Sequence, residues 1–318
     1  MALKHTEIII LGSGPAGSTA AIYCSRAMHQ TLLFTGPYYG GQLTLTAEVE
    51  NYPGFVETIN GTTLIQQLLE QAKKNGAIIV PETITKVDLS RRPFLLNNEV
   101  GDTYSCDALI IATGSKAKWL GLASEEKYRM GGVSACATCD GFLYRNKEVV
   151  VVGGGNTAVE EALYLSNLVS KVTIIHRRAY LTAEAIMQQR IKTKNNIDII
   201  FSCVVEEILG TKNELNKDIV TGIKLKNINT NSEKIIKTDG IFIAIGHKPQ
   251  TELFTGQLNM FNNNYIKTEP DSTVTNIPGV FAAGDVADAK FKQAITAAGK
   301  GCMAAIEAND FLHNNKIK

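Results

Sequence analysis

Two cysteines and an acid stand close together in the middle of the chain, in the segment Cys136-Ala137-Thr138-Cys139-Asp140. A thiol pair at this spacing can exchange two electrons by forming and breaking a disulfide. If a helix starts here, the turn brings both sulfurs into bonding range, and the helix N-terminus stabilises a thiolate. Asp140 follows Cys139 directly, so a carboxyl group that burial keeps protonated would be placed to give a proton to a departing thiolate.

Two other interpretations of these residues stay open. The thiols might form half of a zinc site, although a structural zinc needs four ligands, and Cys24, Cys106, Cys203 and Cys302 are each isolated in apolar segments. We expect those four cysteines to fill core space as small hydrophobic side chains, with no metal bound. Asp140 can alternatively be a helix-capping carboxylate.

The thiol segment lies between two glycine-rich turns. The first is Gly12-Ser13-Gly14-Pro15-Ala16-Gly17, which follows the apolar run Glu7 to Leu11 and precedes helix-forming residues and a second apolar run, Thr31 to Phe34. In a strand–turn–helix of this kind Gly12 allows the tight turn, Gly14 lets the backbone approach a pyrophosphate, and Gly17 lets the helix pack on the strand. The pattern predicts a dinucleotide site with the phosphates at the helix N-terminus.

The same pattern occurs a second time. The apolar run Glu148 to Val152 leads into Gly153-Gly154-Gly155-Asn156-Thr157-Ala158, and Val172 to Ile175 follows as the next strand. Each half also ends in a similar strand, 108–112 before Thr113-Gly114 and 240–244 before Ile245-Gly246. We interpret this as a duplicated α/β architecture with two nucleotide-binding domains.

The C-terminal residues are too few for a third large core. They contain an apolar strand that ends in Gly284-Asp285, and then a helical run over 293–312. The economical arrangement returns the chain to the first domain and inserts the second. This predicts one discontinuous domain, residues 1–116 with 248–318, and one inserted domain, residues 117–247.

Composition narrows the class of protein. A chain of 318 residues with net charge +1 gives no sign of a nucleic-acid or membrane partner. The apolar run near the N-terminus is too short for a signal peptide, and six cysteines do not make a secreted disulfide scaffold. We therefore expect a cytoplasmic protein. The asparagine-rich stretches 213–231 and 259–264 look like polar loops.

The two nucleotide sites differ in the residues that would contact the ribose of the nucleotide. After the second strand of the inserted domain stands His176-Arg177-Arg178, where an NAD site would carry an acid for the 2′-hydroxyl. Two guanidinium groups can bind a 2′-phosphate, so this site favours NADPH, unless the cluster is only a solvated basic turn. The first site has Thr35-Gly36 at that place, which suits a bound flavin nucleotide.

Taken together, these motifs resemble those of the low-molecular-weight bacterial thioredoxin reductases along nearly the whole chain. The resemblance is carried by the two glycine turns and by five further stretches: Gly40-Gly41-Gln42-Leu43, Ala112-Thr113-Gly114, Val133-Ser134-Ala135-Cys136-Ala137-Thr138-Cys139-Asp140-Gly141, His176-Arg177-Arg178 and Ala283-Gly284-Asp285. It implies an α/β fold of two Rossmann-like domains with the NADPH domain inserted into the FAD domain. It also implies FAD and NADPH as cofactors, thioredoxin as partner and a homodimer.

The resemblance also implies which residues bind the cofactors. In the family the segment 35–42 and Asn51 line the FAD, and residues 285–294 close over it. The candidate cofactor-binding residues of the first domain are Gly12, Gly14, Pro15, Ala16, Gly17, Thr35, Gly36, Gly40, Gly41, Gln42, Asn51, Thr113, Gly114, Gly284, Asp285, Val286, Gln293 and Ala294. Those of the inserted domain are Gly153, Gly155, Asn156, Thr157, Ala158, His176, Arg177, Arg178, Ile245 and Gly246, while Thr182 stands where the family commonly has a further arginine.

The resemblance further implies the roles of the thiols. Cys139 is expected to face the flavin, Cys136 to attack the partner disulfide, and Asp140 to act as the acid. A related flavoprotein that reduces another protein or a low-molecular-weight disulfide fits the same motifs. A non-catalytic nucleotide-sensing or zinc-binding module is a different class of function, and it predicts bound metal and a flavin spectrum that NADPH does not bleach.

Overall fold

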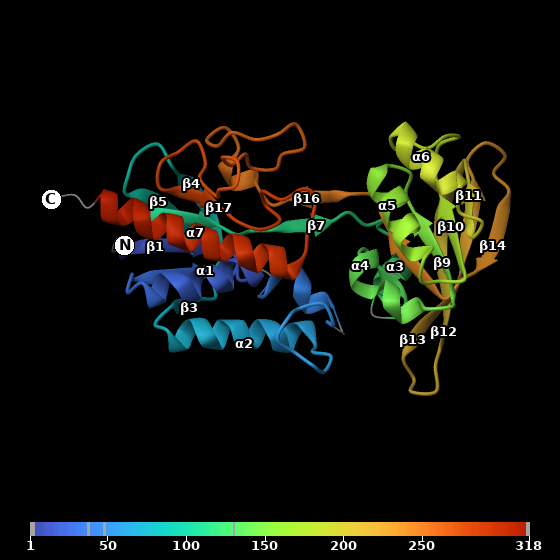
Figure 1. Cartoon of the computed structure of the whole chain (residues 1–318), viewed down its shortest axis with the longest axis horizontal. Helices are drawn as coiled ribbons and strands as arrows, with labels where there is room; N and C mark the ends of the chain where they lie inside the picture. Colours follow the sequence, from blue (N-terminus) through green and yellow to red (C-terminus); the bar gives the residue numbers. More distant parts are fainter. Residues whose placement is uncertain (1–3, 37–38, 47–48, 130, 316–318) are drawn as a thin grey trace. The chain divides into compact units, whose positions relative to one another are not determined.

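The computed structural model of the protein describes residues 4–36, 39–46, 49–129 and 131–315 (Figure 1). Two compact units are formed by the chain. One holds residues 1–116 and 248–318, and the other holds residues 117–247.

A seven-stranded sheet forms the centre of the first unit. Its order is β3-β2-β1-β6-β5-β4, and β17 pairs with β6. The parallel strands are β1 (Lys4–Leu11), β2 (Thr31–Phe34), β3 (Ile78–Val80), β6 (Thr103–Ile111) and β17 (Val280–Ala282). The antiparallel strands β4 (Ile84–Asp88) and β5 (Phe94–Asn98) extend the sheet beyond β6.

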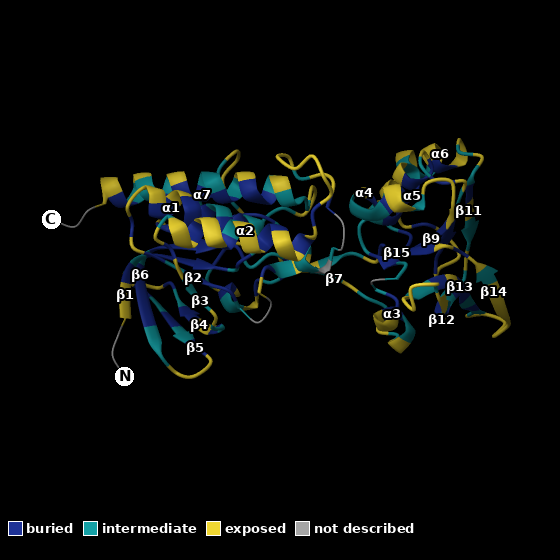
Figure 2. Cartoon of the chain, turned by 90° about the horizontal axis from the view of Figure 1, so that it is seen from below, coloured by how far each residue is buried: buried dark blue, intermediate teal, exposed yellow. Residues whose placement is uncertain are grey.

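Both faces of this sheet are covered, as expected for a parallel sheet whose strands are apolar throughout. On one face, Ile8 and Ile10 share a buried cluster with side chains of α1 (Pro15–Arg26), α2 (Gly61–Lys74) and α7 (Ala294–Asn314). On the other face, Ile9 packs with Phe94 and with Phe254 of η3 (Glu252–Phe254). In Figure 2 strand β6 is mostly buried, while exposed residues recur along α2.

The close contact between α1 and α7 depends on a glycine. A Cβ atom at Gly301 would stand 2.0 Å from the carbonyl oxygen of Ala16, nearer than any side chain can approach. The last helix of the chain can therefore lie directly against the helix that carries the first glycine turn.

The second unit contains a five-stranded parallel sheet in the order β11-β10-β9-β15-β8. Its strands are β8 (Val133–Ser134), β9 (Glu148–Val152), β10 (Lys171–Ile175), β11 (Ile197–Ile200) and β15 (Gly240–Ile243). Val149, Val151 and Phe242 pack in a cluster with α5 (Asn156–Leu165). The remaining helices of the unit are α3 (Ala123–Lys127), α4 (Ala137–Asp140), η2 (Gly141–Tyr144) and α6 (Ala185–Lys192).

An antiparallel three-stranded sheet covers the other face, where Val150, Val152 and Ile241 are buried against it. It consists of β12 (Cys203–Lys212), β13 (Asp218–Asn227) and β14 (Glu233–Lys237). The expectation of a polar loop over 213–231 is therefore wrong for β13. Only its ends are turns: Asn213 and Asn227 accept backbone N–H bonds there, the local pairing that asparagine favours.

The two places where the chain passes between the units are hydrogen-bonded to each other. β7 (Ser115–Ala117) and β16 (His247–Pro249) form a two-stranded sheet. Next to it, the N–H of Lys118 donates to the carbonyl of Gly246, and the N–H of Gln250 donates to that of Gly114. The chain thus leaves and re-enters the first unit at one point. Among the described residues, no helix is long and apolar enough to cross a bilayer.

Candidate active site

Cys136 and Cys139 form a disulfide, with 5.3 Å between their Cα atoms. Cys136 is the N-cap residue of the short helix α4, and its carbonyl accepts the N–H groups of Cys139 and Asp140. That turn brings the two side chains together, as their spacing predicted. Both cysteines are half-buried, and the Thr138 hydroxyl lies 3.4 Å from the Cys136 sulfur.

Asp140 is held beside this disulfide by a side chain that the sequence did not single out. The Ser134 hydroxyl donates to Oδ2 of Asp140 at 2.5 Å and accepts the N–H of Cys136 at 3.0 Å. No side-chain capping bond is made by Asp140 to η2, the element that it precedes. The Asp140 carboxyl group therefore lies at the thiol turn and does not cap η2.

The first glycine turn has the geometry that a dinucleotide requires. Gly12 has φ +106°, and a Cβ there would stand 2.2 Å from the carbonyl oxygen of Ala112. The N-cap of α1 is Gly14, so no side chain caps this helix, and Pro15 is its first residue. Nothing lies within 4 Å of a Cβ position at Gly36 or Gly114. The backbone is thus open at the glycines and the helix N-terminus is available to an anion, which fits the pyrophosphate of FAD.

Several of the other candidate FAD residues lie around this turn. The Ser13 hydroxyl accepts the N–H of Gly40 at 2.8 Å, which joins the glycine turn to the segment 39–46. The amide of Asn51 lies 3.4 Å from the side-chain oxygen of Gln293, so the structure brings these two together. Residues 37 and 38 of the expected FAD-lining segment lie outside the described residues. Val286 is fully buried in the core.

Asp285 follows β17 at the edge of this site. Burial, and to a smaller extent the nearby Asp288, raises the pKa of its carboxyl to about 6. Near pH 7 most of this group is still ionised and accepts hydrogen bonds, which fits contact with the hydroxyl groups of a cofactor.

The second glycine turn is also closely packed. Gly153 has φ +152°, and a Cβ there would stand 2.4 Å from the carbonyl oxygen of Ala244. Gly154 lies against the His176 ring, since a Cβ on Gly154 would be 2.3 Å from its Nδ1. Burial lowers the pKa of His176, and Arg178 and Arg177 lower it further. His176 is therefore neutral near pH 7 and packs behind the turn.

The two arginines belong to the segment 177–184, which we call the arginine loop; Leu181 and Ala183 are buried there and its other residues are exposed. Thr182 fastens this loop to the glycine turn, because its N–H and its hydroxyl both donate to the carbonyl of Gly154, at 2.7 Å and 3.1 Å. Arg177 and Arg178 are exposed on this loop, which is held at the glycine turn that precedes α5.

The thiols and the second glycine turn share one unit. Helix α4, which carries the thiols, packs against α5, and α5 begins at Asn156 directly after the glycines (Figure 1). Ile245 and Gly246 follow β15 at the carboxyl end of the same sheet, with open space at Gly246. The carboxyl ends of the strands are where nucleotides bind in open α/β sheets.

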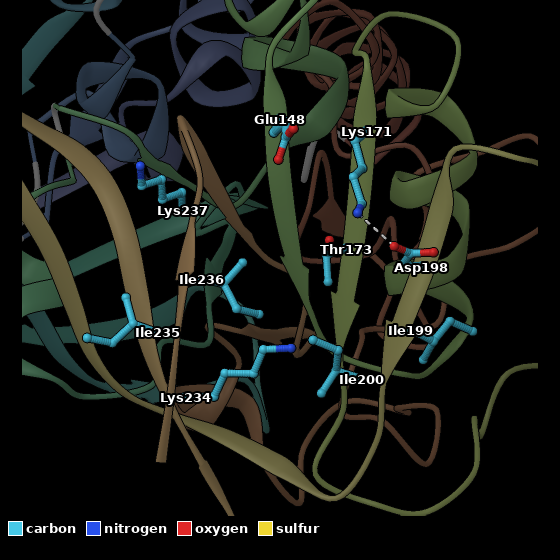
Figure 3. Close-up of a pocket in the computed structure, with 10 residues that line it drawn as sticks. All are labelled: Glu148, Lys171, Thr173, Asp198, Ile199, Ile200, Lys234, Ile235, Ile236 and Lys237. Carbon is cyan, nitrogen blue, oxygen red and sulfur yellow. Dashed lines mark ion pairs between the residues drawn. The ribbon is translucent and has the colours of Figure 1, made fainter.

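A cavity of about 490 Å³ lies elsewhere in this unit, between β14 and the strands β9, β10 and β11 (Figure 3). Its walls include Glu148 and Lys171, at the start of their strands, and Lys171 forms an ion pair of 2.8 Å with Asp198. The lining also reaches Ile200, the last residue of β11, and it includes no residue of the glycine turn.

The other four cysteines lie away from the thiol turn. Cys24, Cys106 and Cys203 are buried and Cys302 is half-buried. Burial raises the pKa of Cys24 to about 12, so this thiol stays protonated and unreactive. In the described ranges of the chain there is no group of three or more histidine, cysteine or acidic side chains that could hold a metal ion.

Comparison with known proteins settles the family. The model of the pyridine nucleotide-disulphide oxidoreductases matches residues 6–301. The chain belongs to this family. The resemblance and the fold class expected from the motifs are confirmed.

Relatives of this oxidoreductase cover the chain almost completely. A thioredoxin reductase of Rickettsia conorii is 53% identical over 97% of this chain and 98% of its own. One from Escherichia coli O157:H7 is 51% identical over 97% of each chain. The solved thioredoxin reductase of Giardia duodenalis is similar with a TM-score of 0.91 and 39% identity, over 98% of this chain and 99% of its own.

Proposed function

We propose that this protein is an NADPH-dependent thioredoxin reductase, in which electrons pass through FAD to the Cys136–Cys139 disulfide and then to thioredoxin. The observation that carries the proposal is the disulfide itself. It sits in a turn that packs against α5, the helix opened by the second glycine turn.

Each nucleotide is assigned to one unit. The first unit, 1–116 with 248–318, holds FAD on the open glycines of α1, and the inserted unit, 117–247, holds NADPH with Arg177 and Arg178 on its 2′-phosphate. When bound, FAD accepts a hydride from NADPH and makes its electron pair available to the disulfide. The residues of the chain bind and orient the cofactors and supply protons.

The thiols then carry out the exchange with the partner. The Cys136 thiolate attacks a sulfur of the thioredoxin disulfide, which forms a mixed disulfide and releases one thioredoxin thiolate. Cys139 attacks Cys136 in turn, which re-forms the Cys136–Cys139 disulfide and releases the second thioredoxin thiolate. Asp140 gives a proton to the Cys136 thiolate when the disulfide is reduced, and takes one back when Cys136 attacks.

Anaerobic titration tests this function. NADPH should bleach the flavin absorbance of the purified protein, and oxidised thioredoxin should restore it with one disulfide reduced per NADPH. Glutathione disulfide and cystine in place of thioredoxin test the alternative, a reductase of low-molecular-weight disulfides. Restoration by these and not by thioredoxin would replace the proposed substrate.

We further propose a homodimer formed through the first unit. Tyr23 of α1 and Ile295 and Ile306 of α7 are 43–49% exposed on two helices that pack together, so they present an apolar surface that a second copy would cover. Sedimentation should give a dimer for the native protein and a monomer for Ile306→Asp. Ile228→Asp, on the second unit and also 49% exposed, is the matched control and should remain dimeric.

A cytoplasmic location is proposed on the chemistry of the thiols. A disulfide that must be reduced in every turnover suits a reducing compartment. Cell fractionation with an antibody against the protein tests this, and recovery outside the cytoplasmic fraction would exclude it.

A further inference from the structure

Ser134 makes a set of contacts that its place in the sequence does not suggest. It ends strand β8, two residues before Cys136, and only 7% of the residue is exposed. Its hydroxyl donates to Oδ2 of Asp140 at 2.5 Å and accepts the N–H of Cys136 at 3.0 Å, and it also lies 3.4 Å from the carbonyl oxygen of Cys136. The Ser134 hydroxyl thus connects the end of strand β8, the backbone of Cys136 and the carboxyl group of Asp140.

This arrangement suits a carboxyl group that changes protonation. A serine hydroxyl has one hydrogen and two lone pairs. While Asp140 is ionised, the serine hydrogen is donated to Oδ2. Once Asp140 is protonated, its own hydrogen can be donated to the serine oxygen, and the serine hydrogen can turn to the carbonyl of Cys136. Rotation about one bond therefore preserves the contact in both states.

The surroundings of Asp140 supply no basic side chain from the two elements packed on its helix. Their titratable residues are Tyr144 of η2 and Glu160, Glu161 and Tyr164 of α5. Burial, together with the charges of Asp140 and Asp239, raises the pKa of Tyr144 to about 12. The hydrogen bond from Ser134 is a charge-assisted contact to the ionised carboxylate and helps to hold it at the thiol turn.

We propose that Ser134 is a positioning residue for proton transfer, which holds the Asp140 carboxyl at the thiol turn in both protonation states. This rests on the proposed function. There the S–S bond breaks and both sulfurs take up the electron pair of the hydride. The hydride supplies one proton of the dithiol and Asp140 supplies the other, and solvent then reprotonates the carboxylate.

The test is the pH profile of thiol formation in the FAD-loaded enzyme. Single-turnover reduction by NADPH is stopped with an alkylating reagent, and free Cys136 and Cys139 are counted by mass. In the native enzyme the rate should fall at high pH as Asp140 ionises. In Ser134→Ala the ionised form loses a charge-assisted hydrogen bond, so the fall should move up by about one pH unit. The rate on the plateau should drop about tenfold, because the acid is no longer held in place.

Three further variants separate this role from simpler explanations. Ser134→Thr keeps the hydroxyl and should keep the native profile. Ser166→Ala removes an equally buried hydroxyl, which donates to a backbone carbonyl in the same unit, and should also keep it. Asp140→Asn should remove the high-pH fall, and adding Ser134→Ala to it should then change nothing.

The outcomes distinguish the positioning role of Ser134 from the proposed thioredoxin reductase function. A native profile in Ser134→Ala, or a shifted one in Ser134→Thr, overturns the positioning role while leaving the enzyme a thioredoxin reductase. A native profile in Asp140→Asn removes the acid role and the role of Ser134 with it. If Ser134→Ala does not retain FAD, Ser134→Thr and Asp140→Asn decide the matter: a shifted profile in the first or a native profile in the second overturns the proposal.

Discussion

Asn156 and Glu184 hydrogen-bond to each other in both directions. The side-chain amide of Asn156 donates to Oε1 of Glu184 at 3.0 Å, and the backbone N–H of Glu184 donates to Oδ1 of Asn156 at 2.8 Å. Asn156 begins α5 and Glu184 is the last residue of the arginine loop, before α6. The pair therefore fixes the end of the arginine loop at the second glycine turn.

Loss of this contact should weaken binding of the 2′-phosphate. Glu184→Ala should raise Kd for 2′,5′-ADP about fivefold, the effect of one hydrogen bond, and leave kcat at saturating NADPH unchanged. Glu184→Gln keeps the Oε1 acceptor and should bind as the native protein does. Calorimetry measures the Kd of both variants. The control is Glu214→Ala, which changes a residue in an exposed turn. Equal losses in the Ala and Gln variants would mean that charge, not the hydrogen bond, matters.

The choice of NADPH over NADH should depend on Arg177 and Arg178. Each contributes about 1.5–3 kcal/mol if it bonds the phosphate, so replacing both with Ala should raise KM for NADPH at least tenfold per residue and change KM for NADH little. Steady-state kinetics with each nucleotide measure this. Arg190→Ala, on α6, is the control. A similar rise for both nucleotides would show that the pair only supports the loop.

The relay through the thiols predicts a split phenotype for Cys139→Ser. The flavin should stay bound and NADPH should still bleach it, because hydride transfer needs no thiol. Thioredoxin reduction should fall to background, while Cys302→Ser keeps normal turnover. Stopped-flow absorbance and an insulin-coupled assay give the two readings. Thioredoxin turnover that survives in Cys139→Ser would rule out the relay.

The raised pKa of Asp285 predicts how stability depends on pH. Because its folded pKa is about 6 and an unfolded Asp has a pKa of about 3.9, the folded state binds more protons between these values. The free energy of unfolding therefore falls as pH rises from about 4 to 6 through this group, by about 3 kcal/mol. Asp285→Asn removes that cost and should raise Tm relative to the native apoprotein at pH 8 but not at pH 4. A Tm difference that does not change with pH would contradict the shift.

Much of the framework could be predicted because it depends on local patterns. β2 and β9 have the predicted bounds, and Cys136 and Cys139 meet because they share one turn of α4. Both glycine turns follow a strand and open a helix, since that geometry needs glycine at Gly12 and Gly153.

What the sequence did not predict depends on tertiary contacts. The sequence did not predict β13, because the strand is buried on one face only and polar residues such as Asn227 lie at its ends. Ser134 belongs to the thiol motif of the resemblance but had no predicted role, and Glu184 belongs to no motif; the roles of both arise from what the fold brings beside Asp140 and Asn156. Their one signal was position, just before the thiol segment and just after the arginine cluster.

The return of the chain to its first unit has a consequence during synthesis. Strand β17 and helix α7 complete the sheet that β1 and β6 begin, but the ribosome makes them only after residues 117–247. At about 5–20 residues per second this interval lasts roughly 7–26 s. Throughout it the inserted unit is still being made, while strands β1 to β6 are already made, with the end of β6 not yet paired to β17 and α1 not yet covered by α7. Nascent chains are therefore most exposed to aggregation and chaperones in this window, and the last helix ends it.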